Sequence, residues 1–538
     1  MAEQRKRKFW GWGYEDQHPN AEQQKHIGER VAKRFGLAPL TITPPPREDE
    51  LNLRAPRIKP PDALTAIFST SIYDRAGHSY GRGYRDVVRA FRRFYPNPFD
   101  AVAFPRDEAE LTRVLEWCDS EHIAVTPYGG GSSVVGGVEP PADGGWRGSV
   151  SIDMTRLDRV LEVDHSSRAA RIQGGVLGPS LEDQLRPHKY TLRHFPQSFE
   201  FSTLGGWIAT RSGGHFATLY THIDDFVESV RVLTPTGVVE SRRLPGSGAG
   251  PSPDRMFIGS EGILGIITEA WMRLQDRPKF RAGASVAFPD FIAGANAVRA
   301  VAQAGLYPAN CRLLDPGEAA NAGANQGEAA VLVLAFESAD HELEPWMKRA
   351  LEICAELGGK IPEGAGRTRT DAEATHEGAA GAWREAFIKA PYLRDVLISM
   401  GIVNDTFETA ITWDRFANYH AQLMESGTDA IRRICGKGTM TCRFTHAYPD
   451  GPAPYYTILA PGKRGSELEQ WDEIKQAVSE VIVKLGGTIT HHHAVGRDHR
   501  PWYDRQRPEG FARALKAAKR ALDPHSILNP GVLIDPER

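Results

Sequence analysis

Cysteine is scarce in this sequence, and the cysteines that are present form no motif. The 538 residues include only five of them, and no two form a C-x-x-C pair. An odd, scattered set argues against a disulfide framework and is typical of reduced thiols in a cytoplasm. The positions are Cys118, Cys311, Cys354, Cys435 and Cys442.

Long apolar runs and an excess of one charge are also absent. No stretch reaches the roughly 18 consecutive apolar residues of a membrane-spanning helix. The opening "MAEQRKRKFWGWGYEDQ" is basic but lacks the apolar core of a secretory signal. Because 65 basic residues face 68 acidic ones, we expect no nucleic-acid partner. A cytoplasmic location is the expectation.

The length predicts more than one domain. Residues 1–95 read as a proline-rich arm with helices, and 96–277 as a mixed α+β domain rich in glycine turns. The strand "RAGASVAFPD" opens a second α/β unit at 278–490, and 491–538 form a C-terminal segment. We also expect a hairpin around "TPTG", because β-rich runs flank it.

The stretch "GRGYRDVVRAFRRFYPNPF" predicts a basic amphipathic helix near 82–95. Val88, Phe91 and Tyr95 share one face, and four arginines surround them. The helix either packs on its own protein with its arginines solvated, which we favour, or lies on the inner face of a membrane. The second alternative would make the protein a peripheral membrane protein.

The strongest local signal is "PYGGGSSVVGGV" at 127–138, directly after the strand "IAVT". Glycines permit positive φ and bring successive N–H groups close to an anion such as a pyrophosphate. The loop matches neither G-x-G-x-x-G nor G-x-x-x-x-G-K-[ST], which argues against Rossmann and P-loop folds. Similar glycine and hydroxyl turns at 197–215 and 259–270 favour one large, extended cofactor over a purely structural role.

Three consecutive histidines, His491, His492 and His493, lie in "TITHHHAVGR". On a strand His492 would oppose the other two, so three neighbours make a poor ligand set for a metal. No cysteine or acidic cluster lies nearby in the sequence, so we expect no metal site. His215, His222 and His446 are interpreted as structural or exposed.

Together these motifs resemble those of a known flavoprotein superfamily. "PYGGGSSV", "FEFSTLGGWIATRSGG", "GSEGILGIITEA" and "DPHSILNPGVL" are similar to the FAD-binding segments of the vanillyl-alcohol-oxidase type. "GWGYEDQ", "PANCRLLD", "YLRDV", "DTFETAITWDR", "CRFTHAY" and "HHHAVG" resemble the alkyldihydroxyacetonephosphate synthase family within it. The resemblance implies an α+β, two-domain, p-cresol-methylhydroxylase-type FAD-binding fold with an α/β cap.

The resemblance implies a non-covalent FAD, since the first glycine loop has no histidine. The residues it assigns to FAD are Pro127, Tyr128, Gly129, Gly130, Gly131, Ser132, Ser133, Gln197, Ser198, Phe199, Glu200, Phe201, Ser202, Thr203, Thr210, Arg211, Ser212, Gly213, Glu261, Gly262, Ile263, Leu264, Gly265, Ile266 and Ile267. It also implies a homodimer.

For catalysis the resemblance implies Tyr455 as acid/base, Arg312 and Arg394 in the substrate pocket, and the three histidines as required groups. Adjacent Tyr456 would point to the opposite face of the strand. The implied reaction exchanges the acyl group of acyl-dihydroxyacetone phosphate for a fatty alcohol through a flavin N5 adduct. We expect nearby positive charge to lower the pKa of Tyr455. The alternative is an FAD-linked oxidase or dehydrogenase of a 2-hydroxy acid or other alcohol.

Overall fold

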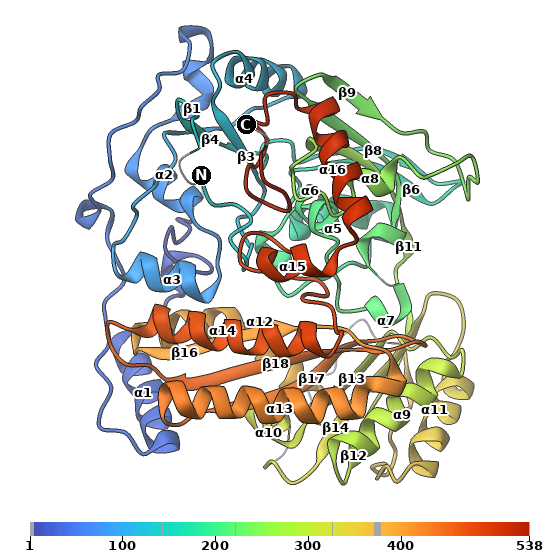
Figure 1. The fold of residues 1–538 in the computed structure, drawn as a ribbon. Coiled ribbons are helices and arrows are strands. Elements are labelled where there is room, and N and C mark those ends of the chain that lie inside the picture. Colours follow the sequence, from blue (N-terminus) through green and yellow to red (C-terminus); the bar gives the residue numbers. More distant parts are fainter. Residues whose placement is uncertain (1–4, 142–143, 221, 325, 371–377, 537–538) are drawn as a thin grey trace.

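The computed structural model describes residues 5–141, 144–220, 222–324, 326–370 and 378–536. Two lobes lie one above the other in Figure 1, with the glycine-rich segments in the upper lobe and a large sheet in the lower one. The arm of residues 5–95 runs along the side of both lobes. Among the described helices, none has the length and apolarity that crossing a bilayer would require.

The upper lobe contains two main sheets. One has the order β1-β2-β4-β3, with β2, β4 and β3 parallel. The other is antiparallel, with the order β5-β6-β10-β8-β9, and the predicted hairpin around "TPTG" is confirmed as β8 and β9. The bounds are Phe68–Ser69 (β1), Ala101–Ala103 (β2), Ala124–Tyr128 (β3), Ser149–Asp153 (β4), Val160–Asp164 (β5), Ala169–Gln173 (β6), Tyr190–Thr191 (β7), Val227–Thr234 (β8), Gly237–Glu240 (β9), Ile266–Arg273 (β10) and Gln275–Asp276 (β11).

The lower lobe is built on an antiparallel sheet with the order β15-β12-β14-β13-β17-β18-β16 among the described residues. Its bounds are Phe280–Phe288 (β12), Asn310–Leu314 (β13), Ala330–Ser338 (β14), Thr368–Arg369 (β15), Ile402–Glu408 (β16), Thr439–Ala447 (β17) and Pro452–Pro461 (β18). One face packs on helices and the other faces the upper lobe, so both faces are buried at the centre and strands such as β17 read as nearly continuous buried runs.

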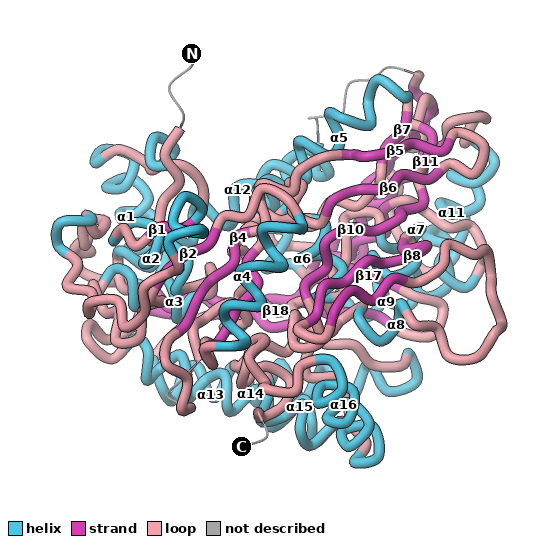
Figure 2. The backbone as a smooth tube through the Cα atoms, turned by 90° about the horizontal axis from the view of Figure 1, so that it is seen from above, coloured by secondary structure: helices cyan, strands magenta, loops and turns pink. Residues whose placement is uncertain are grey.

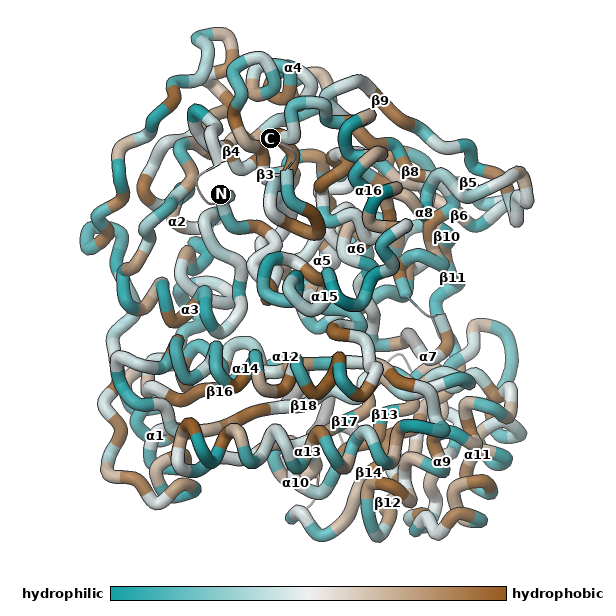
Figure 3. The backbone as a smooth tube through the Cα atoms, in the orientation of Figure 1, coloured by the Kyte–Doolittle hydropathy of each residue, from teal (hydrophilic) through white to brown (hydrophobic). Residues whose placement is uncertain are grey.

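The helices complete both lobes. Figure 3 shows hydrophobic and hydrophilic residues alternating along α13 and α14, which present one apolar stripe to the lower core. Figure 2, from above, shows β5, β6 and β10 side by side. The bounds are Ala21–Phe35 (α1), Ile72–Ser79 (α2), Tyr84–Phe91 (α3), Glu108–Ser120 (α4), Gly178–Leu185 (α5), Leu204–Thr210 (α6), Ala217–Tyr220 (α7), Asp254–Phe257 (α8), Phe291–Gln303 (α9), Pro316–Asn321 (α10), Glu344–Glu356 (α11), Gly378–Ser399 (α12), Trp413–Cys435 (α13), Glu467–Lys484 (α14), Arg500–Gln506 (α15) and Glu509–Leu522 (α16).

The basic helix predicted near 82–95 is α3, and it packs on the protein. Val88 and Phe91 are buried in the same core as the lower sheet. The arginines, expected to be solvated, are instead held in ion pairs, because acidic groups from distant segments meet them. The pairs are Arg85 with Glu139 and Asp498, Arg89 with Asp86 and Glu139, Arg92 with Glu467, and Arg93 with Glu50. Helix α3 therefore presents no unpaired cationic face to a lipid surface.

The C-terminal segment leaves the lower lobe and adds to the upper one. The backbone N–H of Val125 in β3 donates to the carbonyl of Ile527 at 2.8 Å, and Asn529 N–H donates to the carbonyl of Val125 at 2.7 Å. The Lys519 ammonium is buried and donates to Asp523 and to two backbone carbonyls. These contacts place the segment after the histidine run beside the strand that carries the first glycine loop.

Candidate active site

One cavity lies between the two lobes, and both contribute to its walls. The upper lobe supplies the three glycine-rich turns, and the lower sheet supplies charged and polar side chains from several strands. Trp12 of the N-terminal arm also lines it. The lower-lobe and C-terminal residues on its wall are Arg312, Pro391, Arg394, Thr406, Arg443, Thr445, His446, Tyr455, His492, His493 and Ala494, with Asn529 from the tail.

The first glycine loop follows β3 and is closely packed. A Cβ on Gly130 would lie 1.6 Å from the carbonyl oxygen of Phe201, and one on Gly129 would lie 2.2 Å from Thr203 Oγ1. Gly131 has φ of +68°, a conformation that favours glycine. The Ser133 hydroxyl accepts the Gly137 N–H at 3.0 Å and closes the turn. Only glycine at these positions allows the loop after β3 to pack directly against the turn that contains Phe201 and Thr203.

Most residues assigned to FAD by resemblance line this cavity. They are Pro127, Tyr128, Gly129, Gly130, Gly131, Ser132, Ser133, Gln197, Ser198, Ser202, Thr203, Thr210, Ser212, Gly213, Glu261, Gly262, Gly265, Ile266 and Ile267. The others lie away from the lining: Phe199, Glu200, Phe201, Arg211, Ile263 and Leu264. Phe201 and Leu264, for example, are buried behind the wall, and Arg211 pairs with Asp224 at 3.0 Å. Backbone amides and small hydroxyls thus dominate the upper wall, which suits a pyrophosphate.

The acidic side chain on this wall, Glu261, is engaged by the protein itself. Its two carboxylate oxygens accept the N–H groups of Val495 at 2.9 Å and Gly496 at 2.8 Å. Burial raises the pKa of Glu261 to about 7, and these hydrogen bonds oppose the rise. Because Val495 and Gly496 follow the triple histidine, Glu261 ties that run to the cofactor side of the cavity.

On the lower sheet, strand register brings three functional groups into one row. Glu408 of β16 and Arg443 of β17 are the direct cross-strand partners of Tyr455 in β18, so all three point to the same face. The Tyr455 hydroxyl donates to Thr406 Oγ1 at 2.9 Å. Tyr456 points to the opposite face, where its hydroxyl lies 3.1 Å from His420 Nδ1. The expectation that the two tyrosines point to opposite faces of the strand is confirmed, and the acid/base role of Tyr455 stays a prediction.

The pKa of Tyr455 moves in the opposite direction to the one expected. Burial raises it, whereas the Arg443 guanidinium 4.0 Å above its ring and the hydrogen bond to Thr406 lower it, and burial prevails. The expectation of a lowered pKa was wrong because it considered the neighbouring charges without the desolvation of the phenolate.

Arginines provide the positive charge on the lower wall. Arg312 is buried and donates to the carbonyl of His215 at 3.3 Å, and burial together with Arg443 lowers its pKa to about 9. Arg443 is paired with Glu318 of α10. Arg394, from α12, donates to the carbonyl of Arg82. The two predicted arginines thus meet a third, Arg443, in one cavity.

The triple histidine was expected to lie on a strand, but the structure shows otherwise. It forms a series of bends that wrap around the buried carboxylate of Glu408. The N–H groups of His491, His492 and His493 donate to the two Glu408 oxygens at 2.6–3.1 Å, and the Thr490 hydroxyl donates at 2.5 Å. Four donors converging on one carboxylate curve the backbone, so the alternation of faces expected for a strand does not apply.

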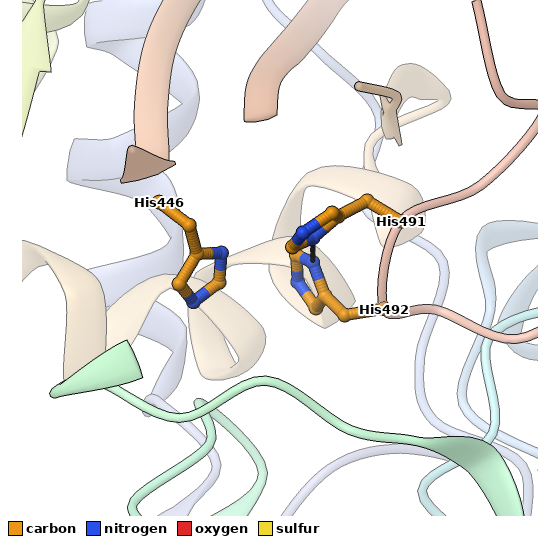
Figure 4. A group of neighbouring side chains, drawn as sticks. All are labelled: His446, His491 and His492. Carbon is orange, nitrogen blue, oxygen red and sulfur yellow. Dashed lines mark hydrogen bonds between the residues drawn. The ribbon is translucent and has the colours of Figure 1, made fainter. Parts of the chain in front are cut away.

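The rings of this run meet histidines from elsewhere in the chain. His446 comes from β17, where a shift of register between Phe444 and His446 turns both Arg443 and His446 toward the cavity. Figure 4 shows His446 facing His491 and His492. The His222 ring centroid lies 4.6 Å from that of His491, and His215 lines the cavity. The interpretation of His215, His222 and His446 as structural or exposed overlooked this convergence.

The histidines are neutral at pH 7. Burial lowers the pKa of His492 to about 3 and that of His493 to about 4, and it holds the pKa of His491 well below its ordinary value. Burial alone would raise the pKa of Glu408, but hydrogen bonds from the Thr490 hydroxyl and from the backbone N–H groups of the three histidines hold it well below the ordinary range. The histidine run therefore supplies none of the positive charge that was expected to lower the pKa of Tyr455.

We predict that replacing Glu408 by glutamine disrupts the histidine run. A glutamine offers one acceptor oxygen, so its NH₂ group would face at least one of the donors now bound by Glu408. Leaving a buried donor unpaired costs about 1–3 kcal/mol, which denaturant unfolding would measure, and catalytic activity should fall with it. The Glu352→Gln control, on the exposed side of α11, should change neither. Unaltered stability and activity of Glu408→Gln would refute this role.

We also predict that the protein loses stability steeply below pH 6.5. His194, His492, His493 and His499 have folded-state pKa values lowered by burial to about 3–4. The unfolded chain protonates near pH 6.5, so the stabilisation is complete above that pH and declines by about 1.4 kcal/mol per histidine per pH unit as the pH falls toward 4. Calorimetry should show a falling transition temperature and proton uptake on unfolding. The variant His492→Gln/His493→Gln should flatten the profile, and an unchanged transition temperature from pH 7 to 5 would contradict it.

Sequence reasoning missed Glu408, Arg443, His446 and Trp12 as parts of this site. Glu408 and Arg443 lie in the quoted stretches "TFETA" and "CRFTHAY", but only the cross-strand register shows that they flank Tyr455. His446 reaches the cavity only because of the β-bulge in β17, and Trp12 reaches it only because the N-terminal arm folds back. No local sequence pattern indicates either feature.

Comparison with known families agrees with the two lobes. Residues 98–241 match the FAD binding domain family, and residues 277–533 match the family of FAD linked oxidases, C-terminal domain. Alkyldihydroxyacetonephosphate synthase of Trypanosoma brucei brucei is 30% identical over 96% of this chain and 88% of its own. The synthase of Dictyostelium discoideum is 31% identical over 86% of this chain and 77% of its own.

Solved structures show the same fold. A crystallised alkyldihydroxyacetonephosphate synthase superposes with a TM-score of 0.79 at 24% identity, covering 97% of this chain and 98% of that one. p-Cresol methylhydroxylase superposes with a TM-score of 0.69 at 15% identity, covering 87% and 94%. The predicted α+β flavoprotein fold of the vanillyl-alcohol-oxidase type is confirmed. With its FAD-binding segments and its site, the chain belongs to the alkyldihydroxyacetonephosphate synthase family of FAD-linked enzymes.

Proposed function

We propose that this chain is an FAD-dependent transferase that exchanges the acyl group of acyl-dihydroxyacetone phosphate for a fatty alcohol, a step of ether-lipid synthesis. Family membership supports the reaction class. The observation that carries the proposal is convergence: Tyr455, Arg312, Arg394, His492 and His493 share one cavity with the glycine loop.

The proposed division of labour follows the lobes. Residues 96–277 and the returning segment 491–538 would hold FAD non-covalently, and 278–490 would form the cap that binds substrate. The amides and hydroxyls of the glycine loop fit the pyrophosphate, and 127–138 contain no histidine for a covalent bond. When bound, FAD would supply the nucleophilic nitrogen that retains the substrate carbon between loss of the carboxylate and entry of the alcohol. Acid precipitation should release the flavin, whereas flavin remaining with the pellet would refute the non-covalent assignment.

The lower wall fits a phosphorylated ketone. Arg312 and Arg394 are natural counter-charges for the phosphate dianion. Tyr455 Oη would act as the acid/base beside the ketone. Burial raises its pKa and keeps it protonated at rest, and Arg443 above its ring favours the tyrosinate form that accepts the proton. His492 and His493, being neutral, would act as hydrogen-bonding groups held in position by Glu408. The buried wall excludes water from the exchange.

Anaerobic titration with acyl-dihydroxyacetone phosphate tests the function. The transferase should lose the visible absorbance of its flavin with this substrate alone, consume no oxygen and need no external electron acceptor. Reduction by a 2-hydroxy acid, followed by reoxidation by oxygen, would identify the oxidase alternative instead. A yellow protein that responds to neither would overturn both.

The assembly and location are proposed from family membership and composition. We propose a homodimer, as the family resemblance implies, and a cytoplasmic location, because the cysteines are scattered and free. A peripheral contact with the inner face of the membrane would serve a lipid substrate, but it would need a surface other than α3, whose arginines are already paired. Sedimentation equilibrium would test the dimer, and flotation with anionic vesicles would test the contact.

A further inference from the structure

Three imidazoles from two distant parts of the chain meet beside the cavity. His446 lies on β17, and His491 and His492 lie in the bends after α14. One ring nitrogen from each lies within 4.8 Å of those of the other two. Figure 4 shows the three rings turned toward one another across a short gap.

The hydrogen bonds of these rings define which nitrogens are available. His446 Nε2 is 3.0 Å from the carbonyl oxygen of Gly214 and must donate to it. His446 Nδ1 therefore carries a lone pair, and this buried atom has no hydrogen-bond partner. His491 Nδ1 and His492 Nδ1 are 3.1 Å apart, while His491 Nε2 lies 3.0 Å from the Tyr448 hydroxyl.

This arrangement has the features of a transition-metal site. Nitrogens bound to a tetrahedral Zn²⁺ at about 2.0–2.1 Å are about 3.3 Å apart, close to the spacing of the two Nδ1 atoms. Imidazole ligands in metal sites use their other nitrogen to bond a protein acceptor or hydroxyl, as His446 does with Gly214 and His491 with Tyr448. Neutral imidazoles need lose no proton to bind.

We propose that His446, His491 and His492 bind one divalent transition-metal ion of the kind that prefers imidazole ligands, such as Zn²⁺, and that the bound ion inhibits the enzyme. His446 and His492 line the cavity, so an ion bound between their rings would lie in the cavity wall and withdraw both side chains from contact with the substrate. One of the two Nδ1 atoms of His491 and His492 carries the hydrogen of the bond between them. To free this nitrogen for the ion, that hydrogen would move to Nε2 of the same ring. Inhibition rests on the proposed function, whereas binding does not.

Three consecutive histidines on a strand would be a poor ligand set for a metal, but the three ligands in this cluster are not consecutive. His446, rather than His493, completes the cluster with His491 and His492. The run is bent rather than extended, and the bulge in β17 turns His446 inward. A cluster of this kind depends on two non-local features and has no sequence signature.

Isothermal titration of the metal-free flavoprotein with Zn²⁺ tests the binding. We expect one Zn²⁺ per chain at micromolar or lower concentration, at least tenfold weaker in His446→Gln, and unchanged in His341→Gln, an exposed histidine on another surface. Circular dichroism and flavin absorbance would verify the fold of His446→Gln. If His446→Gln does not fold, Zn²⁺ binding is measured with His492→Asn instead. The visible absorbance of Co²⁺ bound to the unaltered protein then reports which ligands hold the ion. Equal binding by the unaltered and variant proteins, or Co²⁺ bands typical of water ligands alone, would overturn the site.

A second measurement tests inhibition separately. Stoichiometric Zn²⁺ should abolish acyl exchange, and a chelator should restore it. Binding without inhibition would overturn the inhibitory role and leave the site. If the protein shows no acyl exchange under any condition, the proposed function fails, but the calorimetric result on Zn²⁺ still stands.

Discussion

Replacing Tyr455 by phenylalanine is expected to lower kcat by about 10²–10⁴-fold while the flavin absorbance stays unchanged. The variant keeps the ring under Arg443 and loses only the hydroxyl that donates to Thr406. A positioned acid/base accounts for an effect of this size, whereas loss of one hydrogen bond in a structural role would cost only about 1 kcal/mol of stability. Single-turnover kinetics with acyl-dihydroxyacetone phosphate would measure the loss.

The neighbouring residue provides a matched control. Tyr456→Phe removes a hydroxyl of the same size from the opposite face of β18, where it meets His420 and the helix-covered core. We expect a modest loss of stability and a kcat within a few-fold of the unaltered protein. A pH profile that loses one ionisation only in Tyr455→Phe would distinguish acid/base action from packing. Equal losses in the two variants would contradict the assignment.

Replacing Gly130 by alanine is expected to abolish flavin binding. The added Cβ would lie 1.6 Å from the carbonyl oxygen of Phe201, a backbone atom that cannot rotate away. The loop and the turn at 197–203 must then separate, and both line the proposed pyrophosphate site. Overpacking of this kind costs about 1–3 kcal/mol or more. The ratio of flavin to protein absorbance after purification would fall toward zero.

Gly283→Ala is the control for this variant. Gly283 lies in β12 of the lower sheet, and the nearest heavy atom to its added Cβ is 3.8 Å away, an ordinary contact. It should bind flavin normally. Full flavin content in Gly130→Ala would show that the loop tolerates the displacement and would remove the argument for glycine at this position.

Local patterns predicted the features that depend on nearest neighbours in the chain. Glycine density after a strand indicated the first tight turn, which lines the cavity, and the β-rich runs flanking "TPTG" predicted the hairpin of β8 and β9. The period of two along a strand placed Tyr455 and Tyr456 on opposite faces. These predictions succeed because backbone conformation and side-chain alternation are set within a few residues.

The errors all concern groups whose environment comes from distant segments. The arginines of α3 were expected in solvent, but Glu139, Glu467 and Asp498 reach them from later parts of the chain. The pKa of Tyr455 was expected to fall, but burial between the lobes outweighs Arg443. Desolvation and long-range pairing have no local signature, so composition and spacing could not reveal them.

The sequence by itself determined the fold class, the glycine turns and the identity of the flavoprotein family, because these reside in contiguous motifs that backbone chemistry demands. The tertiary structure alone decided the shape of the histidine run. Glu408, from a strand more than one helix away in the chain, gathers three consecutive N–H groups and bends the run, and a bulge in β17 brings His446 to meet it. The cavity exists only where those distant segments converge, since buried carboxylates and imidazoles must find their partners wherever the fold places them.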